Sequence, residues 1–522
     1  MSLVSKVGRK RPRARIALTI LYLILTIGAL TTLYPFLLMV SIGFKGPTDQ
    51  SDNILVPKYF GDDQELLTKY LDDKYSGEAG IIASTRIGTD QSEVAKYDEF
   101  LKTLPLDMWT AGFKLAPNQV SSKLMVRYQG WLRTKFATVE DLNKAYVEEN
   151  VAFQTVMPPS ELLERPTWKS SNDQKYRDWL VFKATLPTEF RIPVRYERLW
   201  QEFLRVKYKN RINDVPPTLK LGIEKNFGEI PSPNVLKPAT KSVVQLREFE
   251  GIEKEFEASL PSRYLEGTAE KPWADISEDP MPIAGAEQAF VSANKGDLKV
   301  EYATRNYRFV LDYILLHGRA VWNTVLFCGL AVLTQLIVNP LAAYALSRYP
   351  IKASGKILLF LLATMAFPAE VAMIPSFLML KDLGLLNTFA ALILPGAASG
   401  YMIFLLKGFF DSLPPELFEA GQLDGAKEHT LLAKVAIPLS RPVLGYLALM
   451  AFMGSYSTFM FAFLVIQDQK MWTIMVWVYQ LQTSAPKAVV MAALALVALP
   501  TLLVFLCAQR VIMRGIVLPG ER

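Results

Sequence analysis

The sequence predicts an all-α polytopic membrane protein with six transmembrane helices and a large domain inserted between helices 1 and 2. Hydrophobic residues make up 51% of the chain and charged residues only 20%, whereas soluble domains carry about 25% charged residues. The apolar residues form long uncharged runs near the N-terminus and after residue 317, and most acidic residues lie between them. About 20 apolar residues cross a bilayer as a helix, because the backbone polar groups must pair internally.

The first span is predicted over residues 16–44, a run without a charged residue. Residues 1–15 precede it and carry a cluster of Lys and Arg. A signal peptide begins in the same way, but its apolar core is only about 7–15 residues long. We therefore predict an uncleaved helix that starts in the cytoplasm. Nucleic-acid binding is the alternative for the basic cluster, and it is disfavoured beside a hydrophobic run.

The C-terminal membrane region is predicted over residues 318–516. Its five helices are expected at about 320–347, 357–380, 385–407, 438–467 and 488–510. Lys and Arg concentrate in the connections that an N-terminus inside the cell places in the cytoplasm, and they are few in the other loops. This bias predicts that both termini are cytoplasmic. A short apolar segment, 471–485, contains Trp472 and Trp477 and is expected to lie at the outer interface.

The polar block 46–308 is predicted to be an extracytoplasmic folded domain, mainly helical or α+β. It is long enough to bury a core of its own. Residues 128–150 have apolar residues at helical spacing, with a break near Ala137 and with Thr138 as a cap. An aromatic-x-x-aromatic-Leu pattern begins at Tyr97, Tyr128, Tyr176 and Trp200. This pattern is typical of helix faces packed into a core, and a repeated ligand platform is the alternative.

Cysteine and histidine are scarce. Cys328 and Cys507 both lie in apolar runs, where they are expected to pack as small side chains rather than to form a disulfide or bind a metal. His317 and His429 have no ligand-like neighbours at metal spacing. The inserted block contains neither residue type, which excludes catalytic triads that use them there.

The connection 411–437 is predicted to project into the cytoplasm as two short helices joined by a glycine bend. Ser412 is expected to cap the first helix, with Pro414 and Pro415 in its first turn, where proline is tolerated. Gly425 ends that helix, and an apolar face then resumes before Pro438, where the next span is expected to begin.

This connection resembles the signature loop of ABC importer permeases, Glu-Ala-Ala-x-x-x-Gly followed after nine residues by Ile-x-Leu-Pro. The matching residues are Glu419, Ala420, Gly421, Gly425, Val435, Ile437 and Pro438. Asp424 followed by Gly425 and Ala426 is similar to the carbohydrate-uptake (maltose-type, second permease) branch. Gly421 replaces the family's second alanine, a change expected to loosen the helix without abolishing docking.

The resemblance extends over residues 12–46 and 318–522. It includes Asn323-Thr324, the segment 342–348, Phe367-Pro368 and the segment 383–388. The block between the two matching parts is far longer than the corresponding loop of the family. The resemblance therefore implies a permease core at 318–516 with a coupling loop at 411–437.

The resemblance also implies the partners. In such importers the coupling loop seats in a cleft of a separate ATPase subunit. The expected assembly contains two ATPases, a second permease that is identical or different, an extracytoplasmic solute-binding protein and a sugar-like solute. The chain has no Gly-x-x-x-x-Gly-Lys-Ser/Thr phosphate loop. We therefore expect a transport subunit of the bacterial inner membrane that is not itself an enzyme, binds no cofactor, metal or nucleic acid, contacts lipid and relies on partner subunits to use ATP.

Candidate residues of the substrate path lie in two predicted spans. Glu370 is a carboxylate in an apolar run, and such groups usually face a cavity or a partner; placement at the interface is the alternative. In related permeases, Gly-Ser in the fifth span is followed by Trp-Asn-Asp/Glu-Phe. Here Tyr456, Ser457 and Thr458 occupy the first three positions. The loss of the amide and the acid puts the usual sugar contacts in doubt, and helix packing is the alternative role.

Two other functions remain open for the inserted block. One is a membrane-anchored, extracytoplasmic carbohydrate-active enzyme, because residues 128–159 show a faint similarity to a helical stretch of some glycoside hydrolases and paired carboxylates are not excluded. The other is a binding module that docks a partner or captures solute. A docking or gating role is favoured over catalysis.

Overall fold

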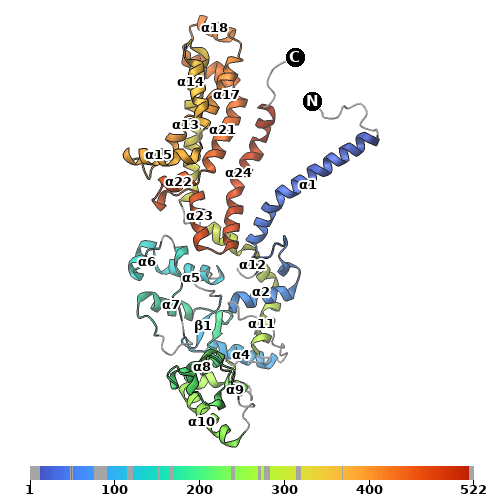
Figure 1. The fold of residues 1–522 in the computed structure, drawn as a ribbon, viewed down its shortest axis with the longest axis vertical. Coiled ribbons are helices and arrows are strands. Elements are labelled where there is room, and N and C mark those ends of the chain that lie inside the picture. The colour runs from blue at the N-terminus through green and yellow to red at the C-terminus, as the bar shows by residue number, and fades with distance from the viewer. Residues whose placement is uncertain are drawn as a thin grey trace. The chain divides into compact units, whose positions relative to one another are not determined.

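The computed structural model describes residues 12–46, 49, 51–75, 91–113, 122–150, 153–161, 163, 169–236, 242–267, 272–274, 282–312, 319–366 and 368–515. The chain divides into two units (Figure 1). The first comprises Met1–Phe309 and Ala485–Val489, and the second comprises Val310–Ser484 and Val490–Arg522. Both are built mainly from helices. His317 and Phe367, which the sequence singled out, lie outside the described residues.

The first unit opens with α1 (Pro12–Gly43), whose stretch Leu18–Gly43 is long and apolar enough to cross a membrane. The described residues of the polar block contain ten further helices: α2 (Asp63–Tyr75), α4 (Gln91–Thr103), α5 (Ser122–Lys135), α6 (Val139–Tyr146), α7 (Gln174–Ala184), α8 (Tyr196–Lys207), α9 (Pro233–Leu236), α10 (Val243–Ser259), α11 (Pro282–Ala293) and α12 (Lys295–Leu311). Short 3₁₀ helices lie at Lys58–Phe60, Phe153–Thr155, Thr188–Phe190, Ile212–Asp214, Pro217–Leu219, Phe227–Glu229 and Ser262–Leu265.

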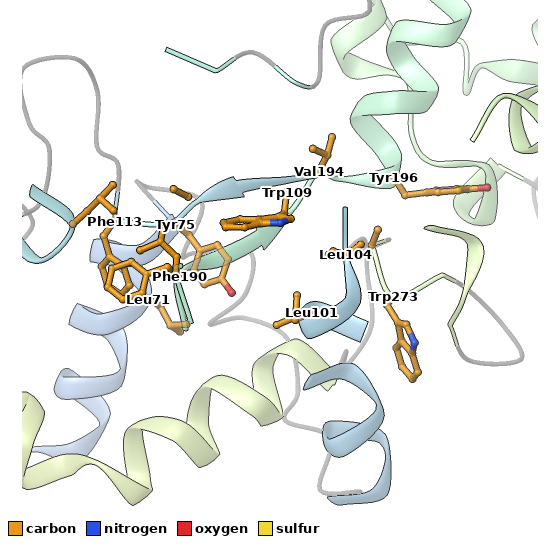
Figure 2. Close-up of a cluster of buried hydrophobic side chains, with 14 of the residues drawn as sticks. Leu71, Tyr75, Leu101, Leu104, Trp109, Phe113, Phe190, Val194, Tyr196 and Trp273 are labelled. Carbon is orange, nitrogen blue, oxygen red and sulfur yellow. The ribbon is translucent and has the colours of Figure 1, made fainter. Parts of the chain in front are cut away.

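A two-stranded antiparallel sheet lies inside this helical domain. Strand β1 (Trp109–Ala111) pairs with β2 (Arg191–Pro193), and Trp109 faces Pro193 in the register. Figure 2 shows Trp109, Phe113 and Phe190 beside these strands, with Tyr75 and Leu71 from α2. All five side chains are buried. The sheet therefore joins segments distant in sequence around one hydrophobic core.

The repeated aromatic pattern belongs to that core. Tyr97, Tyr128, Trp179 and Trp200 are each at most 1% exposed. Their rings contact other rings, as in the edge-to-face pair of Tyr128 and Trp179 with centroids 5.4 Å apart. The core interpretation is confirmed for these four rings, which offer no face to a ligand. Trp131 and Phe203, the second rings of two repeats, are half-buried and pack against the same core.

Helix starts in the domain follow local chemistry. Thr138 has an extended backbone and accepts a hydrogen bond from the Asp141 amide at 3.2 Å, which separates α5 from α6 as predicted. Asp173 caps α7 in the same way by accepting a bond from the Tyr176 amide at 2.7 Å.

Charged side chains are also buried in the first unit. Lys183 and Glu161 form an ion pair at 2.8 Å with side chains 0% and 1% exposed. Burial lowers the pKa of the Lys183 ammonium, and the attraction of Glu161 opposes that effect. Lys74 binds Glu287, which also accepts a hydrogen bond from the Tyr75 hydroxyl. The first pair joins α7 to a segment 22 positions earlier, and the second joins α2 to α11, 213 positions later.

The two ends of the polar block lie next to each other. Asn306 of α12 donates its side-chain amide to the carbonyls of Gly43 at 3.0 Å and Lys45 at 2.6 Å. Tyr307 donates its hydroxyl to the Val40 carbonyl at 2.9 Å. The end of α1 and the last helix of the domain are therefore joined.

The second unit contains α13 (Ala320–Arg348), α14 (Ser354–Ala363), α15 (Ala369–Asp382), α16 (Phe389–Ile393), α17 (Gly400–Asp411), α18 (Glu416–Leu423), α19 (Glu428–Leu431), a π-helical turn (Leu432–Ala436), α20 (Ile437–Leu439), α21 (Arg441–Tyr456), α22 (Met460–Val465), α23 (Ile474–Ser484) and most of α24 (Lys487–Gly515). Short 3₁₀ turns lie at Thr364–Ala366, Leu394–Gly396 and Gln469–Met471. The helices α17 and α21 both pack against α13 (Figure 1).

Three of the predicted continuous spans are broken. In the described part of the chain, three helices are long and apolar enough to cross a membrane: Leu18–Gly43, Ala320–Arg348 and Lys487–Gln509. Two bent pairs bring the number to at most five: Phe389–Gly396 with Gly400–Asp411, bent by 50°, and Glu428–Leu439 with Arg441–Tyr456, bent by 83°.

Each break has a local cause. The expected helix 357–380 is divided between α14 and α15, because Pro368 lacks an amide donor and disfavours helix at the residue before it. The expected helix 385–407 is divided after Leu394–Gly396, and α17 restarts behind the cap Ser399. The expected helix 438–467 begins only at Arg441 and pauses at Ser457 before α22. Uncharged length alone did not reveal these bends.

Candidate functional site

The predicted coupling loop folds as two helices joined by a tight turn. The first, α18, begins at Glu416 behind Pro415. Ser412 does not cap it, which corrects the sequence prediction. Ser412 instead ends α17 and donates its hydroxyl to the Phe409 carbonyl at 2.7 Å. The helix α18 therefore starts without a side-chain cap, and the Glu416 carboxylate lies in its first turn, at the positive end of the helix dipole.

Gly425 makes the turn that ends α18. Its φ is +78°, in the left-handed region that glycine reaches without a steric penalty. The Gly425 amide donates to the Gln422 carbonyl at 3.0 Å, and the Ala426 amide donates to the Gly421 carbonyl at 2.9 Å. This pair of bonds is the Schellman arrangement of a helix C-terminus. The predicted glycine bend is confirmed in its geometry.

Gly421 permits close packing between the two helices of the loop. A Cβ atom at this position would lie 2.5 Å from Cδ2 of Leu431, whose side chain is buried. The expectation that Gly421 loosens the helix therefore misses its structural role. The missing methyl group leaves room for Leu431 against α18.

A cation–π contact anchors the loop to the end of α13. The Arg348 guanidinium lies 3.7 Å from the centroid of the buried Phe418 ring, and Arg348 donates to the Phe410 carbonyl at 2.5 Å. Tyr344 donates its hydroxyl to Glu428 at 3.0 Å. Sequence reasoning used Arg348 as a sign of topology and as part of the matched segment 342–348, and it did not find this anchor. An arginine closing a span opposite an aromatic residue in the loop was the available signal.

The residues matched to the family motif occupy two different environments. Glu419, Ala420, Asp424 and Gly425 are exposed on α18 and its turn, and Gly421 is half-buried. Val435, Ile437 and Pro438 are half-buried behind them, in the π-helical turn and α20. Leu423, which the sequence analysis did not select, is 89% exposed at the end of α18. Leu417, in the first turn of α18, is 43% exposed. The exposed surface therefore combines carboxylates with two leucine side chains.

Glu370 lies at a break between helices. It occupies the first turn of α15, behind Pro368, and it is exposed. A carboxylate suits this position because the N-terminal end of a helix carries partial positive charge. Glu370 is therefore at the start of a helix rather than inside a continuous one.

The three hydroxyl residues at the end of α21 make internal bonds. Tyr456 is buried and donates to the Val497 carbonyl of α24 at 2.7 Å. Ser457 donates to the Met453 carbonyl and Thr458 to the Gly454 carbonyl, both at 2.8 Å. Tyr456 thus joins two helices, which favours the packing alternative for that residue. Ser457 remains exposed.

Comparisons with known proteins match the region that contains this loop. Residues 339–517 match the family described as binding-protein-dependent transport system inner membrane component. The trehalose/maltose transport system permease protein MalG of Thermococcus litoralis is 33% identical over 42% of this chain and 82% of its own length. The lactose transport system permease protein LacG of Rhizobium radiobacter is 31% identical over 37% of this chain and 72% of its own length.

Two further matches cover 66% and 78% of the matched proteins, respectively. A probable ABC transporter permease protein of Bacillus subtilis, YurM, is 31% identical over 37% of this chain and 66% of its own length. A crystal structure of a bacterial ABC transporter involved in alginate import is 27% identical over 39% of this chain, with a TM-score of 0.35. On the strength of the match to 82% of the Thermococcus protein, the chain belongs to the family of inner-membrane permease components of binding-protein-dependent transport systems.

Proposed function

We propose that this chain forms part of the transmembrane path of an ATP-driven importer for a sugar or a related solute. The observation that carries the proposal is the projecting loop, in which an exposed α18 is closed by Gly425 and anchored to α13 through Phe418. The names of the matched relatives support the solute class, since they include permeases for trehalose and maltose and for lactose.

The proposed topology has six spans with both termini in the cytoplasm. The helix α14 has 10 residues, about 15 Å of rise, and cannot cross an apolar layer of about 30 Å alone. We therefore assign α14 and α15 together to one broken span. Broken helices at membrane depth occur where protein or a water-filled cavity covers them. This supports Glu370, at the break, as a candidate residue of the solute path.

The coupling step uses the two faces of α18. The exposed face, with Glu419 and Leu423, seats in a cleft of an ATPase subunit. The buried face, with Phe418, rests on Arg348 at the end of α13. Because Phe418 packs within one apolar cluster with Tyr344 and Phe410, a displacement of α18 is passed to α13 and α17. ATP hydrolysis by the partner then changes the packing of the membrane helices.

In the proposed assembly, each step of import belongs to a different subunit. Two ATPase subunits bind ATP, a second permease completes the path, and an extracytoplasmic binding protein delivers the solute. The inserted domain 46–308 faces the outside of the cell in this topology, where docking of the binding protein or gating of the path is its proposed role. Ser457 and Thr458 remain candidates for solute contact, and Tyr456 holds α21 to α24.

A charge reversal on α18 tests the coupling role. We expect Glu419→Arg to abolish copurification of the ATPase subunit and to reduce solute uptake to the level of a strain without the permease. The carboxylate is exposed on α18, so the change acts on the partner surface rather than on folding. The matched control is Asp382→Arg, an exposed charge reversal at the end of α15. Copurification and uptake that remain normal in Glu419→Arg would contradict the proposal.

A further inference from the structure

Three consecutive aliphatic side chains are exposed just after the first membrane helix. Ile54, Leu55 and Val56 have exposed fractions of 41%, 40% and 67%. Single exposed apolar residues are common on proteins, but a contiguous apolar group usually marks a contact with another molecule or a membrane. These residues lie in the segment that leads from α1 into the inserted domain.

Hydrogen bonds hold this apolar segment against the end of α1. Ser41 donates its hydroxyl to the Ile54 carbonyl at 3.0 Å. Lys45 donates its ammonium to the same carbonyl at 2.8 Å and forms an ion pair with Asp52. The Lys45 side chain is 0% exposed. The segment is therefore fixed at the level of the last turn of α1.

The length of α1 places that turn at the outer edge of a bilayer. Residues 16–44 carry no charge, and Arg15 precedes them. Ser41 follows Arg15 by about 26 positions, which correspond to about 39 Å of helix. A bilayer with its head groups is about 40–45 Å thick. With Arg15 at the inner surface, Ser41 and the bound Ile54 lie in the outer interfacial layer.

The surroundings of the segment have the composition of a membrane interface. The rings of Phe44 and Tyr307 lie 5.2 Å apart, and Phe60 is 38% exposed. Lys58 is exposed between the apolar segment and Phe60. Aromatic rings concentrate at head-group depth, and a lysine can reach lipid phosphates while its stem stays in apolar surroundings. We call Phe44, Ile54–Val56, Lys58, Phe60 and Tyr307 the interfacial collar.

We infer that the interfacial collar rests in the outer leaflet, with Ile54, Leu55 and Val56 among the outer ends of the lipid acyl chains. The occupant of this surface is lipid, because the collar continues directly from a helix that crosses the bilayer. The collar fixes the base of the inserted domain to the membrane surface. This inference does not depend on ATPase coupling, so either proposal can fail alone.

Depth-dependent fluorescence quenching tests the inference on the full chain. Cys328 and Cys507 are replaced by alanine, Val56→Cys is introduced, and the thiol is labelled with an environment-sensitive nitrobenzoxadiazole dye. The protein is placed in nanodiscs of phosphatidylcholine and phosphatidylglycerol containing a nitroxide lipid. Because interfacial segments sit about 5–10 Å into the head-group boundary, we expect a nitroxide near the head group to quench the dye at least about twofold. A nitroxide deep in the acyl chain should quench it less.

Matched positions in the same domain supply the control. Val244 is 78% exposed at the start of α10, and a dye on Val244→Cys should show water-like emission without quenching. Leu55→Cys provides a second site in the collar with the same expected quenching as Val56→Cys. If neither collar site is quenched, the inference is overturned. Water-like emission would then place the segment in solvent, and blue-shifted emission would indicate that a protein partner covers it.

Discussion

The two units of the molecule bury polar groups in different ways. In the first unit, full charges are buried as pairs, as with Lys183 and Glu161. In the second unit, buried amide side chains form hydrogen bonds with backbone groups. Asn323 is 7% exposed and donates to the carbonyls of Lys470 at 2.9 Å and Trp472 at 3.0 Å.

Two other asparagine side chains of the second unit also form hydrogen bonds with backbone groups. Asn339 is buried and accepts a hydrogen bond from the Ser399 amide at 2.8 Å, just before α17 begins. Asn387 has a φ of +58° and accepts bonds from the Gln467 and Asp468 amides at 2.6 and 2.9 Å. The ion pair of Lys407 with Asp411 lies at the surface, with side chains 19% and 44% exposed.

The difference is the one expected between a membrane region and a domain in water. A charge at the centre of a bilayer costs at least about 2.5–3.5 kcal/mol, whereas a neutral amide is accommodated by bonding a backbone group. A domain in water meets no such restriction, provided that each buried charge has a partner. Polar side chains join distant segments in both units, as Lys74 with Glu287 and Asn323 with the Lys470 carbonyl do. The contrast teaches that the first unit uses charged pairs as well as amides for this purpose, whereas the second unit uses neutral amides.

The largest expected effect comes from breaking a buried ion pair in the first unit. Lys183→Met leaves the Glu161 carboxylate without its cation in a buried site, so we expect a loss of about 3–5 kcal/mol in the free energy of unfolding of this unit. Urea unfolding of the detergent-solubilised chain, monitored by hydrogen exchange in α7, measures this loss of free energy.

The double variant Lys183→Met with Glu161→Leu is the control for that prediction. Removing both charges leaves no unpaired charge, and only the Leu106 carbonyl loses its bond from the Lys183 ammonium. Most of the lost stability is therefore expected to return. A double variant as unstable as the single one would contradict the prediction and would show that the bond from Lys183 to the Leu106 carbonyl, rather than charge pairing, holds this site together.

A smaller effect is expected from an amide in the second unit. Asn323→Ala leaves two carbonyls of the segment 470–472 without their donor. We expect a loss of about 1–3 kcal/mol, measured by thermal unfolding in detergent. Ser457→Ala is the control, because its hydroxyl bonds its own helix and is exposed. Equal losses of stability in both variants would contradict the difference between an amide that fixes a loop and a hydroxyl that bonds only its own helix.

The smallest effect concerns an exposed charge in the first unit. A bond from Ser171 and a bond from the Tyr176 amide lower the pKa of Asp173 below its usual 3.8. The ionised carboxylate therefore stabilises the fold above about pH 3.8, and this contribution is lost as the pH falls through the lower pKa of the folded state.

Two substitutions separate the charge of Asp173 from its capping oxygen. Asp173→Ala should cost about 1 kcal/mol at neutral pH. Asp173→Asn keeps the cap acceptor, so it should cost less and should remove the acid dependence. Hydrogen exchange of the first turn of α7 between pH 3 and 7 provides the measurement, and identical pH profiles for the asparagine variant and the unaltered chain would contradict it.

Patterns that act over short distances in sequence were predictable. Long uncharged runs predicted the helices that became α1, α13 and α24, and Thr138 was found from its place before Glu140 and Asp141. Gly425 was found because it interrupts an otherwise helical pattern. The residues of the coupling loop were selected by their spacing, and their role in coupling stays a prediction.

Contacts between distant segments were not predictable from one sequence. Arg348 and Phe418 are 70 positions apart, and only the folded chain shows that they meet. Lys183 and Glu161 come from a helix and an irregular segment, so no periodicity pairs them. The breaks near Pro368 and before Arg441 were hidden because apolar composition does not distinguish a straight helix from a bent one.

The bonds from Asn306 to the carbonyls of Gly43 and Lys45 have a consequence for how the first unit unfolds. They join the two ends of the polar block, so α12 cannot peel away from the end of α1 without breaking both bonds. The two ends of the block are therefore released together, and fraying that starts at one end alone is suppressed.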